Sequence, residues 1–199
     1  MSMTATTPRL LLASASPRRS ALLAQIGVSH RVQATEVDER ALAGEAPWAL
    51  VQRLACAKAL AGVPLADGLP VLGADTIVVL DERVFGKPRD GAEAQAMLLA
   101  LAGRTHRVLS AVALVQASGQ TECRVSESQV RMRAISPAEA LWYWHSGEPR
   151  DKAGGYAIQG LAAIFIEGLT GSFSGVMGLP LFETAQLLGE AGIGIGSAT

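Results

Sequence analysis

The chain has 199 residues, of which 49% are hydrophobic and 18% charged, an ordinary composition for a globular protein with a substantial core. Its formal net charge of -1 excludes the basic excess typical of general nucleic-acid and membrane-surface binders, so any anion site must be local. The two cysteines, Cys56 and Cys123, lack metal-ligand spacing and indicate a reducing compartment. Because the sequence shows neither a signal-peptide pattern nor an apolar run of transmembrane length, we expect a cytoplasmic protein that binds neither nucleic acid nor membrane.

The first third of the chain predicts a strand, a helix, a second strand and a longer helix. The apolar run LLLA is typical of a buried strand, and Ser16 followed by Pro17 is a common helix opening. Pro47 opens a second helix, which is amphipathic and carries Lys58 between apolar neighbours. These elements are expected at 10–13, 17–26, 30–34 and 47–61.

The remaining sequence continues this alternation. PVLGADTIVVLD predicts a central strand, DGAEAQAMLLALAG a helix with an aspartate cap, and SPAEALWYWHSG a helix with Glu139 in the capping-box position. Further strands are expected at 107–116, 122–134 and 163–166, and a last helix at 180–190. The whole pattern predicts an α/β fold with a mixed sheet flanked by helices. We expect one domain over residues 9–191, with flexible ends at 1–8 and 192–199.

Two features of the first motifs suggest a functional site in addition to a structural role. Asp75 lies in an otherwise apolar strand, where it is either a structural carboxylate or part of a site. Its neighbour Thr76 points to the opposite face of that strand. Arg18 and Arg19 stand in the first turn of a helix, where the macrodipole disfavours a cation by up to about 1 kcal/mol.

An anion site would explain the position of these arginines. The serine hydroxyls at 14 and 16 accompany them, and guanidinium groups suit phosphate oxygens. Lys58 and Lys87 can neutralise further phosphate charge, although each can equally be a solvated surface lysine. Glu39 can be a solvated acid of the TEVDER segment. It can also join Asp75 in holding a divalent cation or activating a water.

A glycine-rich loop with the sequence RDKAGGYAIQG supplies a second set of special residues. Asp151 and Lys152 precede its glycines, and Gln159 offers an amide with both a donor and an acceptor. Gly154, Gly155 and Gly160 permit positive φ and a close approach of the backbone to a ligand. Acidic and basic groups beside such a loop suggest a metal-assisted nucleotide hydrolase. The sequence contains neither a Walker A motif nor a G-x-S-x-G nucleophile elbow.

The segments LASASPRRSALL, EVDER, GADTIVVL, GKPRD and DKAGGYAIQG occur in this order. Together they resemble the Maf family of nucleoside triphosphate pyrophosphatases, over most of the chain. The resemblance implies hydrolysis between the α- and β-phosphates with a divalent metal, Mg²⁺ or Mn²⁺. It also implies an elongated sheet with two lobes around a cleft, as in inosine triphosphate pyrophosphatases.

The resemblance also implies roles for individual residues. Asp75 corresponds to the proton acceptor, and Glu39 to its acidic partner; these two are the expected metal ligands, and whether Asp75 is base or ligand stays open. The other expected catalytic residues are Lys58 and Lys87. The expected substrate-binding residues are Ser14, Ser16, Arg18, Arg19, Asp151 and Lys152. The set Arg18, Thr76 and Gln159 matches the members that prefer dTTP and UTP.

Alternative functions remain at this point. A nucleotide-binding regulator of septum formation would need no turnover, and a pyrophosphatase for 7-methyl-GTP or for purine nucleotides would share the same fold. The partner expected in every case is a nucleoside triphosphate, and a homodimer is the commonest oligomer. His30, His106 and His145 show no ligand spacing and are expected to be structural.

Overall fold

The computed structural model describes residues 7–196. Of the two ends predicted to be flexible, residues 1–6 and 197–199 lie outside this described part. The strands are β1 (Leu10–Ala13), β2 (His30–Gln33), β3 (Val71–Leu80), β4 (Arg83–Phe85), β5 (Thr105–Val115), β6 (Thr121–Met132) and β7 (Ile166–Thr170). The α-helices are α1 (Pro17–Gln25), α2 (Pro47–Gly62), α3 (Gly91–Leu101), α4 (Pro137–His145), α5 (Phe173–Met177) and α6 (Leu181–Glu190). Short 3-10 helices cover Val63–Leu65, Glu148–Asp151, Ala153–Gly155 and Leu161–Phe165.

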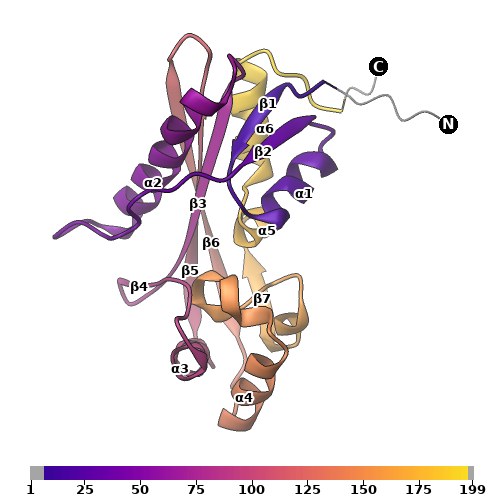
Figure 1. Cartoon of the computed structure of the whole chain (residues 1–199). Coiled ribbons are helices and arrows are strands. Elements are labelled where there is room, and N and C mark those ends of the chain that lie inside the picture. The colour runs from indigo at the N-terminus through magenta and orange to yellow at the C-terminus, as the bar shows by residue number, and fades with distance from the viewer. Residues whose placement is uncertain (1–6, 197–199) are drawn as a thin grey trace.

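The strands form a single mixed sheet in the order β2-β1-β3-β5-β6-β7, with β4 paired to β3. Strand β1 runs parallel to both β2 and β3, whereas β3, β5, β6 and β7 are successively antiparallel. The three longest strands, β3, β5 and β6, run through the whole length of the molecule (Figure 1). The predicted mixed α/β fold is therefore confirmed.

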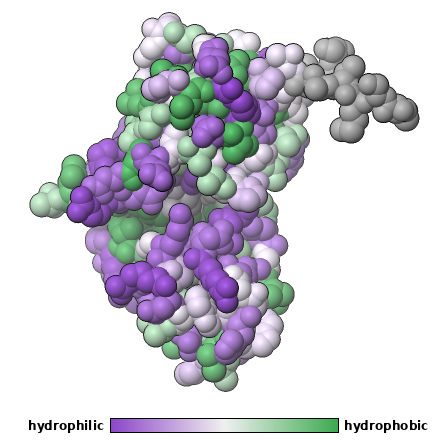
Figure 2. All heavy atoms as spheres, viewed as in Figure 1, coloured by the Kyte–Doolittle hydropathy of each residue, from purple (hydrophilic) through white to green (hydrophobic). Residues whose placement is uncertain are grey.

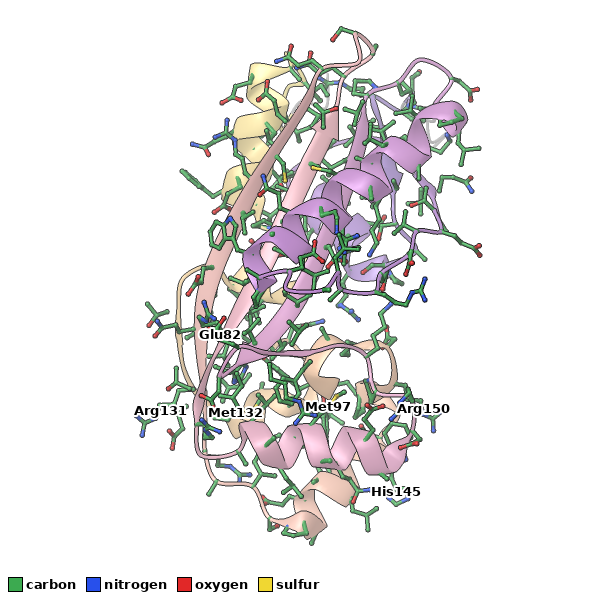
Figure 3. All side chains as sticks on the ribbon, turned by 90° about the vertical axis from the view of Figure 1, so that its left-hand side faces the viewer. Glu82, Met97, Arg131, Met132, His145 and Arg150 are labelled. Carbon is green, nitrogen blue, oxygen red and sulfur yellow. The ribbon has the colours of Figure 1, made fainter. Side chains whose placement is uncertain are left out.

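Helices cover the sheet differently in its two halves. In the upper half of Figure 1, α2 packs on one face of the sheet, and α1 and α6 pack on the other. In the lower half, α3 and α4 pack around the other ends of the long strands and enclose a separate apolar core. Figure 3 shows the same division from the side, with α2 across the strands above and Met97 and Met132 in the lower half. The molecule thus has the two expected lobes, which share three strands.

A glycine sets how closely α2 approaches the sheet. A Cβ atom on Gly73 would lie 2.4 Å from both the Ala55 carbonyl oxygen and the Ala59 amide nitrogen. The helix backbone therefore rests directly on β3, which only a residue without a side chain allows. The buried face of α2 includes Lys58, whereas Leu60 is 52% exposed. Lys58 therefore belongs to the face of the helix that is turned towards the sheet.

The strand expected at 163–166 is wrong. Residues Leu161–Phe165 form a 3-10 helix, and the strand β7 follows it at Ile166–Thr170, paired with β6. The carboxylate of Glu148 accepts hydrogen bonds from the amides of Leu161 and Ala162, at 2.9 and 3.3 Å. Because these amides are the first of the helix, a side chain from elsewhere in the chain determines the conformation of this apolar segment.

Residues 192–196, part of the predicted flexible C-terminal end, are packed against the upper lobe. Ile193 is 6% exposed and belongs to the core between α1, α6 and the sheet. The amide of Gly196 donates to the Ile26 carbonyl at 2.9 Å. Among the described residues, no helix combines the length and apolar character that crossing a membrane requires.

Candidate active site

A cavity of about 440 Å³ lies where the two lobes meet. Figure 2 shows this face of the molecule hollowed near its middle, with hydrophilic side chains on both sides. Every side chain that the sequence singles out for a site lines this cavity. These residues are Ser14, Ser16, Arg18, Arg19, Glu39, Lys58, Asp75, Thr76, Lys87, Asp151, Lys152 and Gln159. They come from α1, α2, β3 and four segments, which connect β1 to α1, β2 to α2, β4 to α3 and α4 to β7. Their convergence is a finding of the structure.

The turn between β1 and α1 is held by its own hydroxyl groups. Ser16 caps the helix, since its side chain accepts from the Arg19 amide at 3.5 Å. Ser14 in turn accepts from the Ser16 amide and from Arg19 Nη1, each at 3.2 Å. The two serines therefore shape the loop that presents the arginines to the cavity.

Arg18 and Arg19 differ in how firmly they are held. The Nε of Arg19 donates to the Gly178 carbonyl at 2.8 Å, which ties α1 to the end of α5. Burial lowers the pKa of Arg19, while the nearby Asp75 carboxylate opposes that shift. Arg18 lies in the cavity wall and reaches Asp151 in the other lobe at 3.3 Å. Arg19 is thus a fixed cation, whereas Arg18 forms an ion pair that spans the cleft.

Lys58 joins the two expected catalytic carboxylates. Its Nζ lies 2.6 Å from Asp75 Oδ1 and 2.6 Å from Glu39 Oε1. The Lys58 side chain is 11% exposed and that of Asp75 is 9% exposed. Lys58 is therefore not a solvated surface lysine, and Asp75 is a paired charge inside its strand, as the cost of burying an unpaired one requires.

Glu39 and Lys87 complete the charged wall of the cavity. Burial alone would raise the pKa of Glu39, but the hydrogen bond and charge of Lys58, together with Lys87 and Arg19, lower it. Glu39 is therefore an ionised carboxylate at neutral pH. Lys87 is an exposed residue of the loop after β4. It lines the cavity, and its positive charge helps to lower the pKa of Glu39. Glu36 and Asp38 of the same acidic segment do not line the cavity.

The glycine-rich loop closes the opposite side of the cavity. Burial raises the pKa of Asp151, but the adjacent ammonium of Lys152 and the charge of Arg18 outweigh burial, so that this pKa is lowered. Gly154 and Gly155 use the positive φ that glycine permits, with values of 69° and 68°. Gly160 does not, since its φ is -109°. It must be glycine for another reason, since a Cβ there would lie 2.1 Å from the Glu148 carboxylate.

Tyr143 and Glu148 hold this loop from behind, and the sequence analysis assigned neither to the site. The Tyr143 hydroxyl donates to Glu148 Oε1 at 2.6 Å and accepts from the Ala157 amide at 3.1 Å. The same carboxylate accepts from the Leu161 amide. Gln159 thus lies in a segment anchored on both sides, with its side chain exposed beside the cavity. A buried tyrosine five residues before a glutamate is too common a pattern to have revealed this network.

Thr76 lines the cavity from the other face of β3. Its hydroxyl shares a hydrogen bond of 2.7 Å with Ser110 Oγ and lies 3.4 Å from the Gly178 carbonyl. The apolar part of the wall comes from residues that the sequence analysis did not select. They include Val78, Val108, Tyr156, Val176 and Met177.

The donor set fits a divalent cation only in combination with a ligand. The described residues contain no group of three or more histidine, cysteine, aspartate or glutamate side chains able to hold a metal. Glu39 and Asp75 each contact Lys58 through one oxygen, so each retains a second carboxylate oxygen. Two carboxylates suit Mg²⁺ or Mn²⁺ when substrate phosphate oxygens and water supply the other ligands.

Comparison with known proteins places the chain in a family. A family model described as "Maf-like protein" matches residues 9–191. A dTTP/UTP pyrophosphatase of Saccharophagus degradans is 55% identical over 183 residues, which cover 90% of this chain and 87% of the relative. Proteins of the same name from Alkalilimnicola ehrlichii and Myxococcus xanthus are 52% and 51% identical, each over 92% of this chain and 93% of the relative.

Among solved structures, the chain resembles a nucleoside-triphosphatase, or dITP/XTP pyrophosphatase, from Mycobacterium abscessus. The sequence identity is 23% and the TM-score is 0.41, with 63% of this chain and 73% of the other covered. The family model covers nearly all of the described residues, and the curated relatives match at more than half identity. The chain therefore belongs to the Maf family.

Proposed function

We propose that this protein is a nucleoside triphosphate pyrophosphatase that hydrolyses dTTP and UTP to the monophosphate and pyrophosphate. The observation that carries the proposal is the Glu39–Lys58–Asp75 cluster, which lies in one cavity with two arginines and a glycine-rich loop. Relatives of more than 50% identity named dTTP/UTP pyrophosphatase support the choice of substrate. A cytoplasmic location fits this role, because nucleotide pools are cytoplasmic.

The charges of the cavity suggest how the chain divides the work. Arg18, Arg19 and Lys87 bind the phosphate chain, and their positive charge stabilises the pyrophosphate as it leaves. Asp75, a residue of β3 that is ion-paired with Lys58, orients a water towards the α-phosphorus or accepts its proton. Glu39 and Asp75 both neutralise the positive charge of Lys58, so that Asp75 is not the sole counter-ion of this lysine among the cavity residues. Asp151 and Lys152 line the opposite side of the cavity.

Glu39 and Asp75 would hold the divalent cation, Mg²⁺ or Mn²⁺, through the oxygens that Lys58 does not contact. Such an ion neutralises phosphate charge and makes a bound water more acidic. Removal of the metal by a chelator is expected to abolish turnover. A direct check is the binding of Mn²⁺ followed by electron paramagnetic resonance, which Asp75→Asn should weaken.

The residues that select the nucleobase of the substrate are Arg18, Thr76 and Gln159. The Gln159 amide offers a donor and an acceptor, which match the acceptors and donor on the edge of uracil or thymine. Replacing Gln159 by Glu keeps the size but removes the donor, so the preference for UTP over 7-methyl-GTP should fall. An unchanged preference in Gln159→Glu would remove this residue from base recognition.

A nucleotide-binding regulator without turnover is the second candidate. The joint presence of Asp75, Glu39 and Lys87 in one cavity weighs against it, because binding alone does not require two carboxylates beside a phosphate. The homodimer expected from the sequence remains a prediction, which sedimentation equilibrium would check.

The test is release of pyrophosphate from dTTP, UTP, CTP, GTP and 7-methyl-GTP by purified protein with Mg²⁺ or Mn²⁺. We expect turnover of dTTP and UTP, and a loss of kcat of about 100-fold or more in Asp75→Asn with the fold intact by circular dichroism. Turnover of 7-methyl-GTP instead would retain the chemistry and refute the substrate. Binding without turnover of any nucleotide would favour the regulator.

A further inference from the structure

The two cysteines of this chain come from distant segments and meet at one place on the sheet. Cys56 lies on α2 and Cys123 on β6. Both side chains pack against the apolar core beneath α2, where this helix and β6 are in contact. Each is half-buried and neither takes part in the cavity described above. The pair is therefore a contact that the proposed catalysis does not use.

Strand register explains why these two side chains meet. Cys123 on β6 lies opposite Ala113 on β5, and Ala113 lies opposite Gly73 on β3. The backbone of α2 approaches β3 most closely at Gly73, through Ala55 and Ala59. Cys56 directly follows Ala55 in α2, so it lies beside this crossing. The row Gly73, Ala113 and Cys123 runs from the crossing across the sheet to β6.

We propose that Cys56 and Cys123 are a peroxide-sensitive thiol pair that closes to an intramolecular disulfide joining α2 to β6. The inference rests on the position of the two thiols and does not depend on the proposed function. Paired thiols with one reactive and one resolving member are the arrangement that confines oxidation to a reversible product.

The chemistry needs one equivalent of hydrogen peroxide. The Cys56 thiolate attacks one peroxide oxygen, the O–O bond breaks, and a sulfenic acid and hydroxide form. The Cys123 sulfur then attacks the sulfenic sulfur, the S–O bond breaks, and the hydroxyl group leaves as water with the thiol proton. In total, two thiols and one peroxide give one disulfide and two waters. A dithiol such as dithiothreitol reverses the step.

The assignment of roles follows from the contact between the thiols. The neighbouring Cys123 thiol lowers the pKa of Cys56, whereas the Cys56 thiol and burial raise the pKa of Cys123. The thiolate is the nucleophile, so Cys56 attacks the peroxide and Cys123 resolves the sulfenic acid. The disulfide would also fasten α2, which carries Lys58, to β6.

The test treats the full-length reduced protein with hydrogen peroxide, alkylates the remaining thiols under denaturing conditions and measures the intact mass. We expect the number of alkylated cysteines to fall from two to none, without a covalent dimer on a non-reducing gel. Dithiothreitol should restore both. Peptide mapping should show one crosslinked peptide that contains Cys56 and Cys123. Two thiols that stay alkylatable, or a crosslink between chains, would overturn the proposal.

Two single variants separate the roles. In Cys123→Ser, the sulfenic acid at Cys56 has no partner and should be trapped by dimedone. In Cys56→Ser, Cys123 should remain a thiol over the same time. Reaction of Cys123 at the rate of Cys56 would contradict the order of attack. Because neither cysteine lines the cavity, both reduced variants should keep the melting temperature and basal activity of the parent, which controls for misfolding.

Discussion

Lys58 makes three side chains of the site depend on one another. Its ammonium contacts one oxygen of Asp75 and one of Glu39. Lys58 and Asp75 are largely closed to water, whereas the Glu39 side chain is half exposed. Two carboxylates around a shared cation are stable only while the cation is present, because like charges at close range disfavour ionisation. Lys58 is thus at once a structural counter-ion and part of the candidate catalytic cluster.

Lys58→Met should therefore cost stability as well as activity. Removing one partner of a buried ion pair leaves an uncompensated charge, and we expect a loss of about 3 kcal/mol in the free energy of unfolding. Urea titration at neutral pH would measure it. Arg89→Met is the matched control, because Arg89 is 83% exposed and water screens its ion pair with Glu93. Equal losses of unfolding free energy in the two variants would show that the buried cluster stabilises the fold no more than an exposed ion pair does.

The neighbouring arginines should separate binding from stability. Arg18→Ala removes a cation that, within residues 7–196, forms one ion pair, with the exposed Asp151. We expect KM for the nucleotide to rise about tenfold, which corresponds to about 1.4 kcal/mol, with the unfolding free energy nearly unchanged. Arg19→Ala removes hydrogen bonds to Gly178 and Ser14, so it should lose about 2 kcal/mol of stability. Kinetics and urea titration on both variants would test this, and equal effects on stability would contradict it.

At the scale of elements, the contact of α2 with β3 places Lys58 over Asp75. The contact is close because Gly73 has no side chain, and because a Cβ on Gly62 would likewise lie 2.7 Å from Val71. Small residues at the crossing bring the helix axis close to the sheet. A lysine from the buried face of the helix therefore reaches a carboxylate on the strand without crossing an apolar layer.

Gly73→Ala should disturb both the packing and the site. The new methyl group would meet the backbone of α2 at 2.4 Å, so the helix must move. We expect a loss of about 2 kcal/mol from overpacking and a fall in kcat as Lys58 shifts from Asp75. Gly168→Ala is the control, since Gly168 is also a strand glycine but has no atom within 4 Å of the added Cβ. The prediction fails if thermal melts place the two variants at the same midpoint.

At the scale of the whole molecule, three shared strands unite the lobes and the site lies at their junction. His106 on β5 belongs to the lower part of this junction and is 1% exposed, with Nε2 at 2.7 Å from the Tyr156 hydroxyl. Burial lowers the pKa of His106 to about 4. The folded protein therefore keeps this histidine neutral over a pH range in which the unfolded chain binds a proton.

Stability should fall with acidity in a defined window. The unfolded histidine takes up its proton near pH 6.5 and the folded one near pH 4, so unfolding is favoured progressively as the pH falls between these values. Each pH unit costs at most about 1.4 kcal/mol. Urea titrations from pH 7 to about pH 4.5 should show this slope in the parent protein and a smaller one in His106→Gln. Identical slopes would show that other groups govern the acid response.

Local sequence signals determined most of the elements. The helix openings at Ser16, Asp90 and Ser136 are confirmed, because each cap is a hydrogen bond within a few residues of the chain. Long apolar strands were also predictable, since burial on both faces leaves a continuous hydrophobic run. The strand expected at 163–166 is wrong because its conformation depends on Glu148, which is distant in sequence.

The sequence by itself determined the α/β class and the residue types of the site, since motifs record which chemistry the chain carries. It could not determine which charges meet. Only the tertiary structure decided that Lys58 is buried between Glu39 and Asp75. It also decided that the Glu148 carboxylate fills the space that a side chain at Gly160 would need, and that Cys56 lies beside Cys123. The physical reason is that pairing, burial and close approach are properties of strand register and helix placement, and these arise from contacts summed over the whole chain.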